Sequence, residues 1–296
     1  MRARRARVAL AIYFGLLAGL AAEEPDTSVA VTPITDSLYL LQGSGGNVVA
    51  SVGGDGVLLV DDDYAPYAEA YQQAIIHLTA ADQPARFVLN THWHADHTGG
   101  NRYWGEQRSI ILAHENVRRR MSSRQEIAAL GRVVEPSPGL ALPLVTYGDG
   151  LTLHFNGDDV EVQHYPRGHT DGDSVVYFSA ANVVHMGDLL FKDAFPFVDI
   201  SSGGNVFGYI ANVAAVLAQV DDNTVIVPGH GSLADKGDLQ RYHRMLVTTS
   251  DEVKAALEAG RSVDEITAAG LGEAWSSWGR GFIDEARWVS FIAASL

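Results

Sequence analysis

The sequence predicts an α/β protein in which two sheets pack face to face and helices cover their outer sides. Two halves follow one another along the 296 residues, and each contains short apolar segments typical of strands, followed by helical patterns. Glycine-rich turns separate many of these segments, as expected for strands joined by tight connections. Two such sheets bury their apolar sides best against each other, which leaves the helices outside.

The first 22 residues have the composition of a secretory signal peptide. Four arginines precede an apolar run from Val8 to Leu20, and small residues follow before the first acidic residue. A transmembrane anchor is the alternative, but the run is shorter than the roughly 20 apolar residues that span a bilayer. We therefore expect residues 1–22 to be removed during export to the periplasm or the medium, by the Sec or the twin-arginine route. The mature chain, 23–296, is predicted to be a single domain without stable membrane insertion.

Composition argues against a nucleic-acid partner and against cysteine chemistry. The chain carries 21 basic and 36 acidic residues, a formal charge of −15, and loss of residues 1–22 removes four arginines, which leaves −19. Such a surface repels polyphosphates, so nuclease activity is disfavoured and a small-molecule substrate is expected. The sequence has no cysteine, which excludes disulfides and thiolate metal ligands. Composition leaves the oligomeric state open.

The first half begins with a short acidic lead, 23–33, and an antiparallel meander of strands. Apolar and small residues then recur at helical spacing over 66–78, and a second helix is predicted over 115–130. Three prolines and two glycines within 131–143 indicate a loop. The predicted strands of this half are 38–41, 47–52, 57–60, 86–90 and 109–112.

The second half repeats the order of strands followed by helices. A helical pattern covers 205–220, and helices are predicted from 233 to about 257 and in two further pieces beyond. Residues 240–296 are therefore expected to form a mainly helical C-terminal extension. The predicted strands of this half are 151–155, 160–164, 175–178, 183–186 and 224–227.

Four strong metal ligands follow the apolar segment 86–90 within six residues. In extended backbone, side chains two residues apart share one face, so His92 and His94 can hold one ion together. Two glycines after the cluster allow the chain to turn, which can direct Asp96 and His97 to a second point nearby. Neutral imidazole and carboxylate are the ligands that borderline metals such as zinc prefer. This spacing predicts a metal site.

Three further candidate ligands stand beside glycine, after strand-like segments: His169, Asp188 and His230. Each alone is a weak signal, since a histidine or aspartate next to glycine more often belongs to a turn. Loops at strand ends that converge on one edge of a two-sheet sandwich strengthen the signal, because they bring such side chains together. Seven ligands suffice for two four- or five-coordinate metals when one carboxylate and a water bridge them.

The His-x-His-x-Asp-His motif at 92–97, followed in order by His169, Asp188 and His230, resembles the metallo-β-lactamase superfamily. The resemblance spans about residues 35–250. It implies the family's four-layer αβ/βα sandwich, which agrees with the two-sheet architecture expected above. It also implies a hydrolase that uses two Zn²⁺ ions, although other divalent metals are possible.

The resemblance further implies a role for each ligand. The first metal would be held by His92, His94 and His169. The second would be held by Asp96, His97 and His230, and Asp188 would bridge the two metals. Asp61, at the end of the segment 57–60, resembles the family's structural acid beneath the first motif.

Two residues depart from the zinc β-lactamases that this chain otherwise resembles around its later motifs. Asp188 stands where those enzymes have a cysteine ligand, and His97 is a ligand that they usually lack. A bridging aspartate is instead typical of the glyoxalase II-like thioesterases and lactonases of the superfamily. Lys192 and Asn205 lie near the positions where such lactamases hold the substrate. Their alternative roles are a solvated lysine and a capping asparagine.

The primary hypothesis is a binuclear zinc hydrolase in which a metal-bridging hydroxide opens a cyclic amide, ester or thioester. Asp96 is the expected catalytic residue, as a ligand that also orients the nucleophile. Two alternatives stay open: a mononuclear iron dioxygenase of the same fold, and a non-catalytic periplasmic metal-binding protein. The full set of seven ligands argues against the first, which needs only two histidines and one aspartate.

Overall fold

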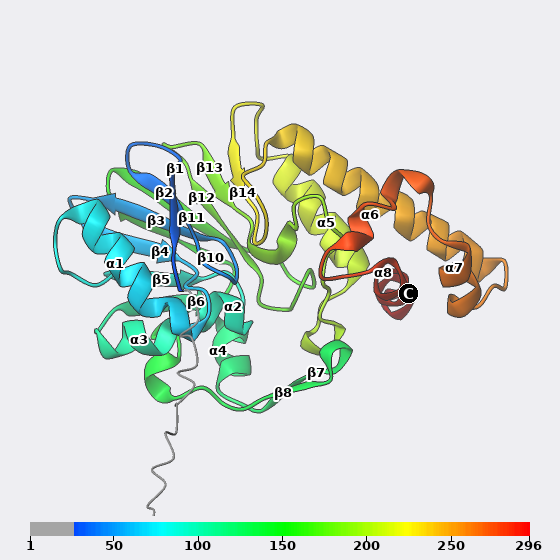
Figure 1. The fold of residues 1–296 in the computed structure, drawn as a ribbon, viewed down its shortest axis with the longest axis horizontal. Coiled ribbons are helices and arrows are strands. Elements are labelled where there is room, and N and C mark those ends of the chain that lie inside the picture. Colours follow the sequence, from blue (N-terminus) through cyan, green and yellow to red (C-terminus); the bar gives the residue numbers. More distant parts are fainter. Residues whose placement is uncertain (1–26) are drawn as a thin grey trace, which may run out of the picture.

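The computed structural model describes residues 27–296, so the predicted signal peptide, 1–22, lies outside the described residues. Figure 1 shows two sheets packed against each other, with an apolar layer between them and helices on the outer side of each. This is the four-layer αβ/βα sandwich that was predicted, extended at its C-terminal end by further helices. Among residues 27–296, no helix has the length and apolar character required to cross a bilayer.

The first sheet has seven strands in the order β1-β2-β3-β4-β5-β6-β9. The first four strands form the predicted antiparallel meander, whereas β4, β5, β6 and β9 run parallel to one another. The sequence did not indicate β1 or β9; every residue of β1 is exposed, so it lacks an apolar pattern. The bounds are β1 Ala30–Pro33, β2 Leu38–Gln42, β3 Val48–Gly53, β4 Gly56–Val60, β5 Phe87–Asn90, β6 Ile110–His114 and β9 Val145–Tyr147.

The second sheet has five strands in the order β10-β11-β12-β13-β14. Its first four strands are antiparallel, and β14 is parallel to β13. All five strands were predicted to within two residues at each end. The bounds are β10 Gly150–Phe155, β11 Asp158–His164, β12 Ser174–Phe178, β13 Val183–His185 and β14 Val225–Val227.

Alternating side chains of the strands build the core on both faces of each sheet. In β4, Leu58 and Val60 lie in the apolar layer between the sheets, whereas Val57 and Leu59 pack toward the helices on the outer side. This alternation follows from the two-residue period of a strand. Every strand flanking the metal site is therefore held from two sides.

The helices include a C-terminal group whose apolar residues join the core on the outer face of the second sheet. Helix α5 begins at the predicted position, and α6 is capped by reciprocal hydrogen bonds between Asp235 and Asp238. The α-helices are α1 Ala68–Thr79, α2 Ala95–Thr98, α3 Asn101–Glu106, α4 Glu115–Met121, α5 Val206–Leu217, α6 Lys236–Glu258, α7 Val263–Ala269 and α8 Glu285–Ser295. The 3₁₀ turns are Ala65–Tyr67, Ala128–Leu130, Gly139–Ala141, Gly187–Leu189, Ile200–Ser202, Glu273–Trp275 and Trp278–Arg280.

The predicted helix over 115–130 was wrong in its second part. Helix α4 ends at Met121, where the hydroxyls of Ser122 and Ser123 donate to the carbonyl of Arg119. The chain then forms a two-stranded hairpin, β7 (Gln125–Ile127) and β8 (Arg132–Val134). The predicted loop 131–143 was therefore also partly wrong, since it contains β8 and one 3₁₀ turn. Burial of Ile127 in the core stabilises this hairpin over the continued helix.

Candidate metal centre

The seven predicted ligands lie in loops at one edge of the two sheets. His92 and His94 follow β5 directly, and α2 carries the next two ligands of the same motif. The other three come from the second sheet: one from the β11–β12 connection, one from the turn after β13, and one after β14. Strand ends from both sheets meet here because the sheets pack face to face. The structure brings all seven side chains together in two adjacent groups.

The first group consists of three histidines and one aspartate, all buried. Their ligand atoms lie within 4.8 Å of one another: His92, His94, His169 and Asp188. His94 Nδ1 lies 2.8 Å from His169 Nε2, and His169 Nε2 lies 3.4 Å from Asp188 Oδ2. Three imidazole nitrogens and one carboxylate oxygen around one point are donors that suit a divalent metal ion such as zinc.

The second group contains Asp96, His97 and His230, with ligand atoms again within 4.8 Å of one another. Asp96 Oδ2 lies 3.3 Å from His230 Nε2 and 3.6 Å from His97 Nε2. Asp188 connects the two groups, because its Oδ2 faces the first while its Oδ1 lies 3.1 Å from His97 Nε2. One carboxylate thus contacts ligands of both groups.

Hydrogen bonds from surrounding residues orient the histidine rings. His97 Nδ1 lies 2.7 Å from Asp61 Oδ2, and His94 Nε2 lies 3.1 Å from Asp199 Oδ2. His169 Nδ1 lies 2.7 Å from the Phe197 carbonyl oxygen, which can only accept, so this nitrogen carries the proton. The opposite nitrogen of each ring is then free to face the centre. Such outer partners set the tautomer and direction of metal-binding histidines.

Asp61 has the position that the sequence suggested for a structural acid. It follows β4 in a left-handed backbone conformation (φ 63°), and its carboxylate also accepts from Thr91 N at 2.7 Å and Thr91 Oγ1 at 2.8 Å. Asp199, in contrast, was missed. It follows an apolar segment without a ligand-like motif. It lies 105 residues after His94 in the sequence, and only the fold brings the two side chains together.

Three buried atoms at the centre test whether these residues fit a metal. His92 Nε2, His97 Nε2 and Asp188 Oδ1 have no hydrogen-bond partner among residues 27–296. Buried polar atoms are costly when left unpaired, and a cation would satisfy all three at once. Burial lowers the pKa of His169 to about 4, which leaves a neutral imidazole ready to bind a cation. Burial also lowers the pKa of His230, but Asp188 and Asp96 outweigh it and raise this pKa to about 9, so a metal ion would have to displace a proton there. The donor set therefore fits divalent metal ions, held by both groups.

The Asp188 carboxylate remains ionised despite its burial. Burial raises its pKa, but the imidazoles around it outweigh that effect and hold the pKa well below its usual range. An ionised carboxylate between two sets of imidazoles can contact a metal on either side. This is the electrostatic requirement for a bridging ligand.

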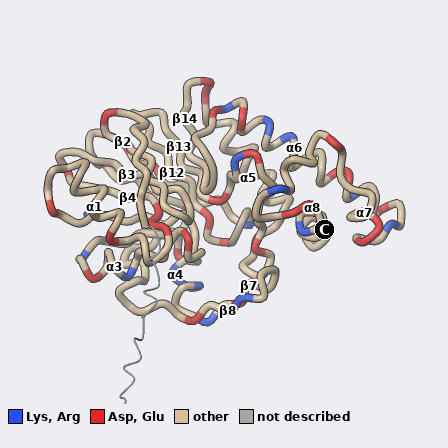
Figure 2. The backbone as a smooth tube through the Cα atoms, viewed as in Figure 1, with Lys and Arg blue, Asp and Glu red and all other residues tan. Residues whose placement is uncertain are grey.

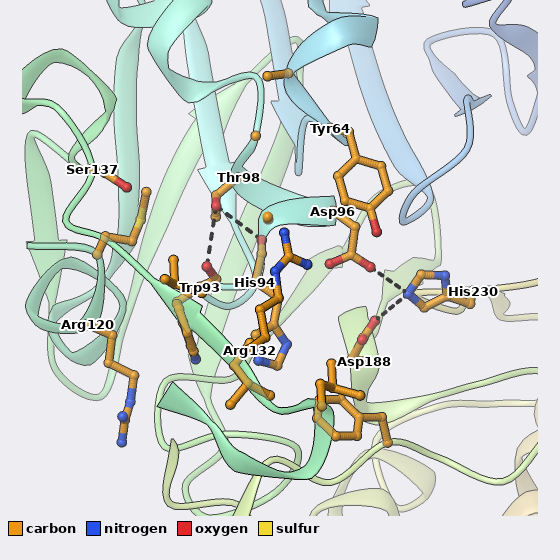
Figure 3. A pocket seen from close by; sticks show the side chains of 18 of the residues that line it. Tyr64, Trp93, His94, Asp96, Thr98, Arg120, Arg132, Ser137, Asp188 and His230 are labelled. Carbon is orange, nitrogen blue, oxygen red and sulfur yellow. Dashed lines mark hydrogen bonds and ion pairs between the residues drawn. The ribbon is translucent and has the colours of Figure 1, made fainter. Parts of the chain in front are cut away.

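A cavity of about 870 Å³ opens in front of the two groups. Figure 3 shows Asp96, Asp188 and His230 meeting at one wall, with Tyr64 beside Asp96. Aromatic side chains such as Trp93 line the cavity as well, and part of its rim comes from the β7–β8 hairpin. Its size and mixed lining suit a small organic molecule next to the metal ligands.

The two predicted substrate-binding residues are engaged elsewhere. Lys192 lines the cavity, but its ammonium group pairs with Asp238 and donates to the Leu233 carbonyl at 3.1 Å. Asn205 caps helix α5 by accepting from two backbone amides and donates to the carbonyl of Ser295. A substrate contact by either side chain would first require these bonds to break.

Comparison with known sequences places this arrangement in a family. The sequence model of the Metallo-beta-lactamase superfamily matches residues 41–230, well over half of the chain. The 2,4-dinitroanisole O-demethylase subunit alpha of Nocardioides sp. is 22% identical over 241 residues, which are 81% of this chain and 69% of that protein. The hydroxyacylglutathione hydrolase GloC of Haemophilus influenzae is 25% identical over 186 residues, which are 62% of this chain and 86% of that protein.

A solved structure shares the fold. A metallo-beta-lactamase from Pontibacter korlensis superposes with a TM-score of 0.61 at 21% identity, covering 74% of this chain and 99% of its own. The matched residues include all seven ligands and every strand from β3 to β14. The chain therefore belongs to the metallo-beta-lactamase superfamily, as an enzyme of the hydrolase class with a His/Asp metal-binding cluster.

Proposed function

We propose that the protein is a binuclear zinc hydrolase that cleaves an ester, a thioester or a cyclic amide. The observation that carries this proposal is the position of Asp188, whose two oxygens face separate groups of ligands. Two divalent ions held there would lower the pKa of bound water toward about 7 and polarise the substrate carbonyl. A single mononuclear site would leave the second group of ligands without a use.

Asp96 is the residue that we propose to orient the attacking water. Burial raises its pKa, but His97 and His230 outweigh that effect and hold it at about 2, so the carboxylate accepts hydrogen bonds at neutral pH. It stands at the cavity wall, with one oxygen directed to His230 (Figure 3). An acceptor fixed at that wall aligns the water for attack on a carbonyl carbon in the cavity.

Esters and thioesters are the favoured substrates within this class. A bridging aspartate in place of cysteine is the arrangement that suggested thioesterases and lactonases, and the relative GloC is named a hydroxyacylglutathione hydrolase. The apolar part of the cavity lining would hold the acyl chain or ring. Cleavage of an activated aryl ether is a second candidate, supported by the named O-demethylase subunit that aligns with 81% of this chain.

We also propose that the enzyme works outside the cytoplasm. The support is the N-terminal sequence, where arginines precede a short apolar run and small residues. Cell fractionation and N-terminal sequencing of the mature protein test this: a cytoplasmic protein that begins at Met1 would contradict it.

The deciding experiment combines metal analysis with a hydrolysis panel. Protein purified without added metal is analysed for zinc and iron, then tested with lactams, lactones, thioesters and 2,4-dinitroanisole, with and without chelator. We expect two zinc ions per chain and chelator-sensitive hydrolysis of a thioester or lactone. One iron per chain with oxygen consumption would establish a dioxygenase instead. Two bound zinc ions without any turnover would favour a metal-binding protein.

Two variants separate catalysis from folding. Asp96→Asn removes the proposed acceptor and is expected to lower kcat by at least about 100-fold. Its zinc content is measured in parallel, because Asp96 is also a ligand. Asp82→Asn makes the same chemical change at an exposed residue of the loop before β5, whereas the ligands follow that strand, and it serves as the control. Equal activity of both variants would refute the role of Asp96.

A further inference from the structure

Four cationic side chains line the cavity, and carboxylates hold three of them. Arg102 Nε lies 2.9 Å from Glu106, and Arg120 makes two hydrogen bonds of 2.7 Å to the carboxylate of Asp171. Lys192 pairs with Asp238, as described above. Each of these three cations therefore already has an acidic partner within the chain.

The fourth cation, Arg132, is not compensated. Its guanidinium forms no ion pair or hydrogen bond within the part of the chain that the structure describes. Figure 3 shows the side chain extending from β8 into the cavity, toward the wall that carries Asp96. Glu135, its acidic neighbour on the same rim, lies 3.5 Å from Arg124 instead. A free guanidinium thus faces the space in which a substrate would lie.

The hairpin that carries Arg132 is anchored to the body of the protein. Arg132 pairs across the hairpin with Ile127, which is 5% exposed and belongs to the large apolar core. Next to it, the Ala128 amide donates to Ser201 Oγ at 3.2 Å. Basic and acidic residues alternate along this segment, in the order Arg124, Glu126, Arg132 and Glu135 (Figure 2). The backbone of Arg132 is therefore placed by packing, as a binding residue requires.

The charge of Arg132 reaches the site wall. Burial raises the pKa of the Tyr64 phenol, Asp96 raises it further, and Arg132 acts in the opposite direction. Tyr64 and Asp96 lie together at the wall in Figure 3. The guanidinium is thus within electrostatic range of the residues that surround the reacting group, yet it is not bonded to any of them.

We infer that Arg132 binds a carboxylate that the substrate carries at a distance from the scissile carbonyl. A planar guanidinium matches a carboxylate with two parallel hydrogen bonds, which fixes direction as well as charge. This inference rests on the proposed function, and it narrows the substrate class to acyl compounds with an added negative charge. It also explains how an acidic chain admits an anionic substrate: one uncompensated cation stands at the entrance.

The test measures binding, so it does not depend on turnover. The zinc-loaded protein is titrated with butyrate and with glutarate, two chains that differ by one carboxylate, and binding is followed by calorimetry. We expect glutarate to bind about tenfold or more tightly in the wild type, a typical effect of a hydrogen bond between charged groups. We expect Arg132→Gln to reduce this preference to near unity.

Arg102→Gln is the matched control, because it removes an arginine of the same cavity that already has a partner. It should retain the preference for glutarate. The inference is overturned if the wild type shows no preference or if Arg132→Gln keeps it. Thermal melting of each variant shows whether the fold is intact. Arg132 is exposed, so the melting temperature of the Arg132→Gln variant should equal that of the wild type.

Hydrolysis provides a second and separate measurement. For a pair of thioesters with and without a distal carboxylate, Arg132→Gln should raise KM for the anionic member about tenfold and leave the neutral member unchanged. An equal change for both members contradicts the role of Arg132. Absence of hydrolysis by the wild type contradicts the proposed function, while the glutarate titration still decides the inference about Arg132.

Discussion

Replacing Asp61 by asparagine removes the charged acceptor that orients His97. The carboxylate has three hydrogen bonds of 2.7 to 2.8 Å, to the Thr91 amide, the Thr91 hydroxyl and His97 Nδ1. Asparagine preserves one acceptor but presents an NH₂ group to a donor that is fully buried. The hydroxyl can rotate toward another acceptor, whereas the imidazole N–H cannot, so the loss falls mainly on His97.

The expected cost follows from that single unsatisfied contact. A hydrogen bond to a charged group contributes about 1.5–3 kcal/mol, and changing such an outer partner typically lowers metal affinity 10- to 100-fold. His97 belongs to the second ligand group, so the second ion should be the one that is held less tightly. In the first group, His94 keeps its hydrogen bond to Asp199.

Asp199→Asn provides the reciprocal experiment, since it should weaken zinc binding by the first group and leave zinc binding by the second group unchanged. Each variant is titrated with zinc against a chromophoric chelator, and NMR of the imidazole nitrogens identifies which rings have lost their ion. Asp61→Asn should release zinc from His97 and His230 first; Asp199→Asn should release it from His94 and His169 first. The same order of release in both variants would refute the assignment of outer partners to groups.

Three further outcomes follow from the structure. Asp188→Cys should shift turnover from esters toward lactams on the hydrolysis panel if the bridging carboxylate sets specificity; unchanged ratios would show that it does not. A methyl group on Gly46 would lie 2.2 Å from His97 Cε1, so Gly46→Ala should displace that ring and reduce bound zinc from two ions to one by metal analysis. His114 stacks on His164 with ring centres 3.6 Å apart, and burial lowers its pKa to about 4 from 6.5. The unfolded chain therefore takes up a proton as the pH falls from 6.5 toward 4 while the folded one does not, and stability should drop by about 1–2 kcal/mol at pH 5 in urea melts. His114→Gln should lose less stability than the wild type as the pH falls, and an identical pH dependence of stability in both proteins would contradict the prediction.

The metal ligands could be predicted because their spacing is local. Four of them lie within six residues, and the others stand beside glycines after predicted strands, a pattern that can be seen in the sequence without knowledge of the fold. The hairpin at 125–134 could not be predicted in the same way. Its residues have no alternating apolar pattern, and its conformation depends on Ile127 reaching a core built from distant segments.

The roles of single polar residues also differ in whether a local pattern or tertiary packing determines them. Asp61 was singled out because, at the end of an apolar strand, it resembles the family's structural acid, whereas Asp199 and Arg132 acquire their positions only from tertiary packing. Asn205 is the opposite case: its place in the sequence suggested a substrate contact, but in the structure it caps a helix. Local pattern therefore identified the candidate ligands, whereas the partners of individual side chains follow only from the three-dimensional fold.

The hairpin and its flanking loops, 122–144, contain none of the seven metal ligands, although they form part of the cavity rim. Insertions, deletions or changes of charge in this segment would alter which molecules enter without moving the seven candidate ligands. Part of the substrate preference would thus be encoded apart from the residues that hold the metal. Engineering a new preference could begin with randomised libraries of this short segment alone.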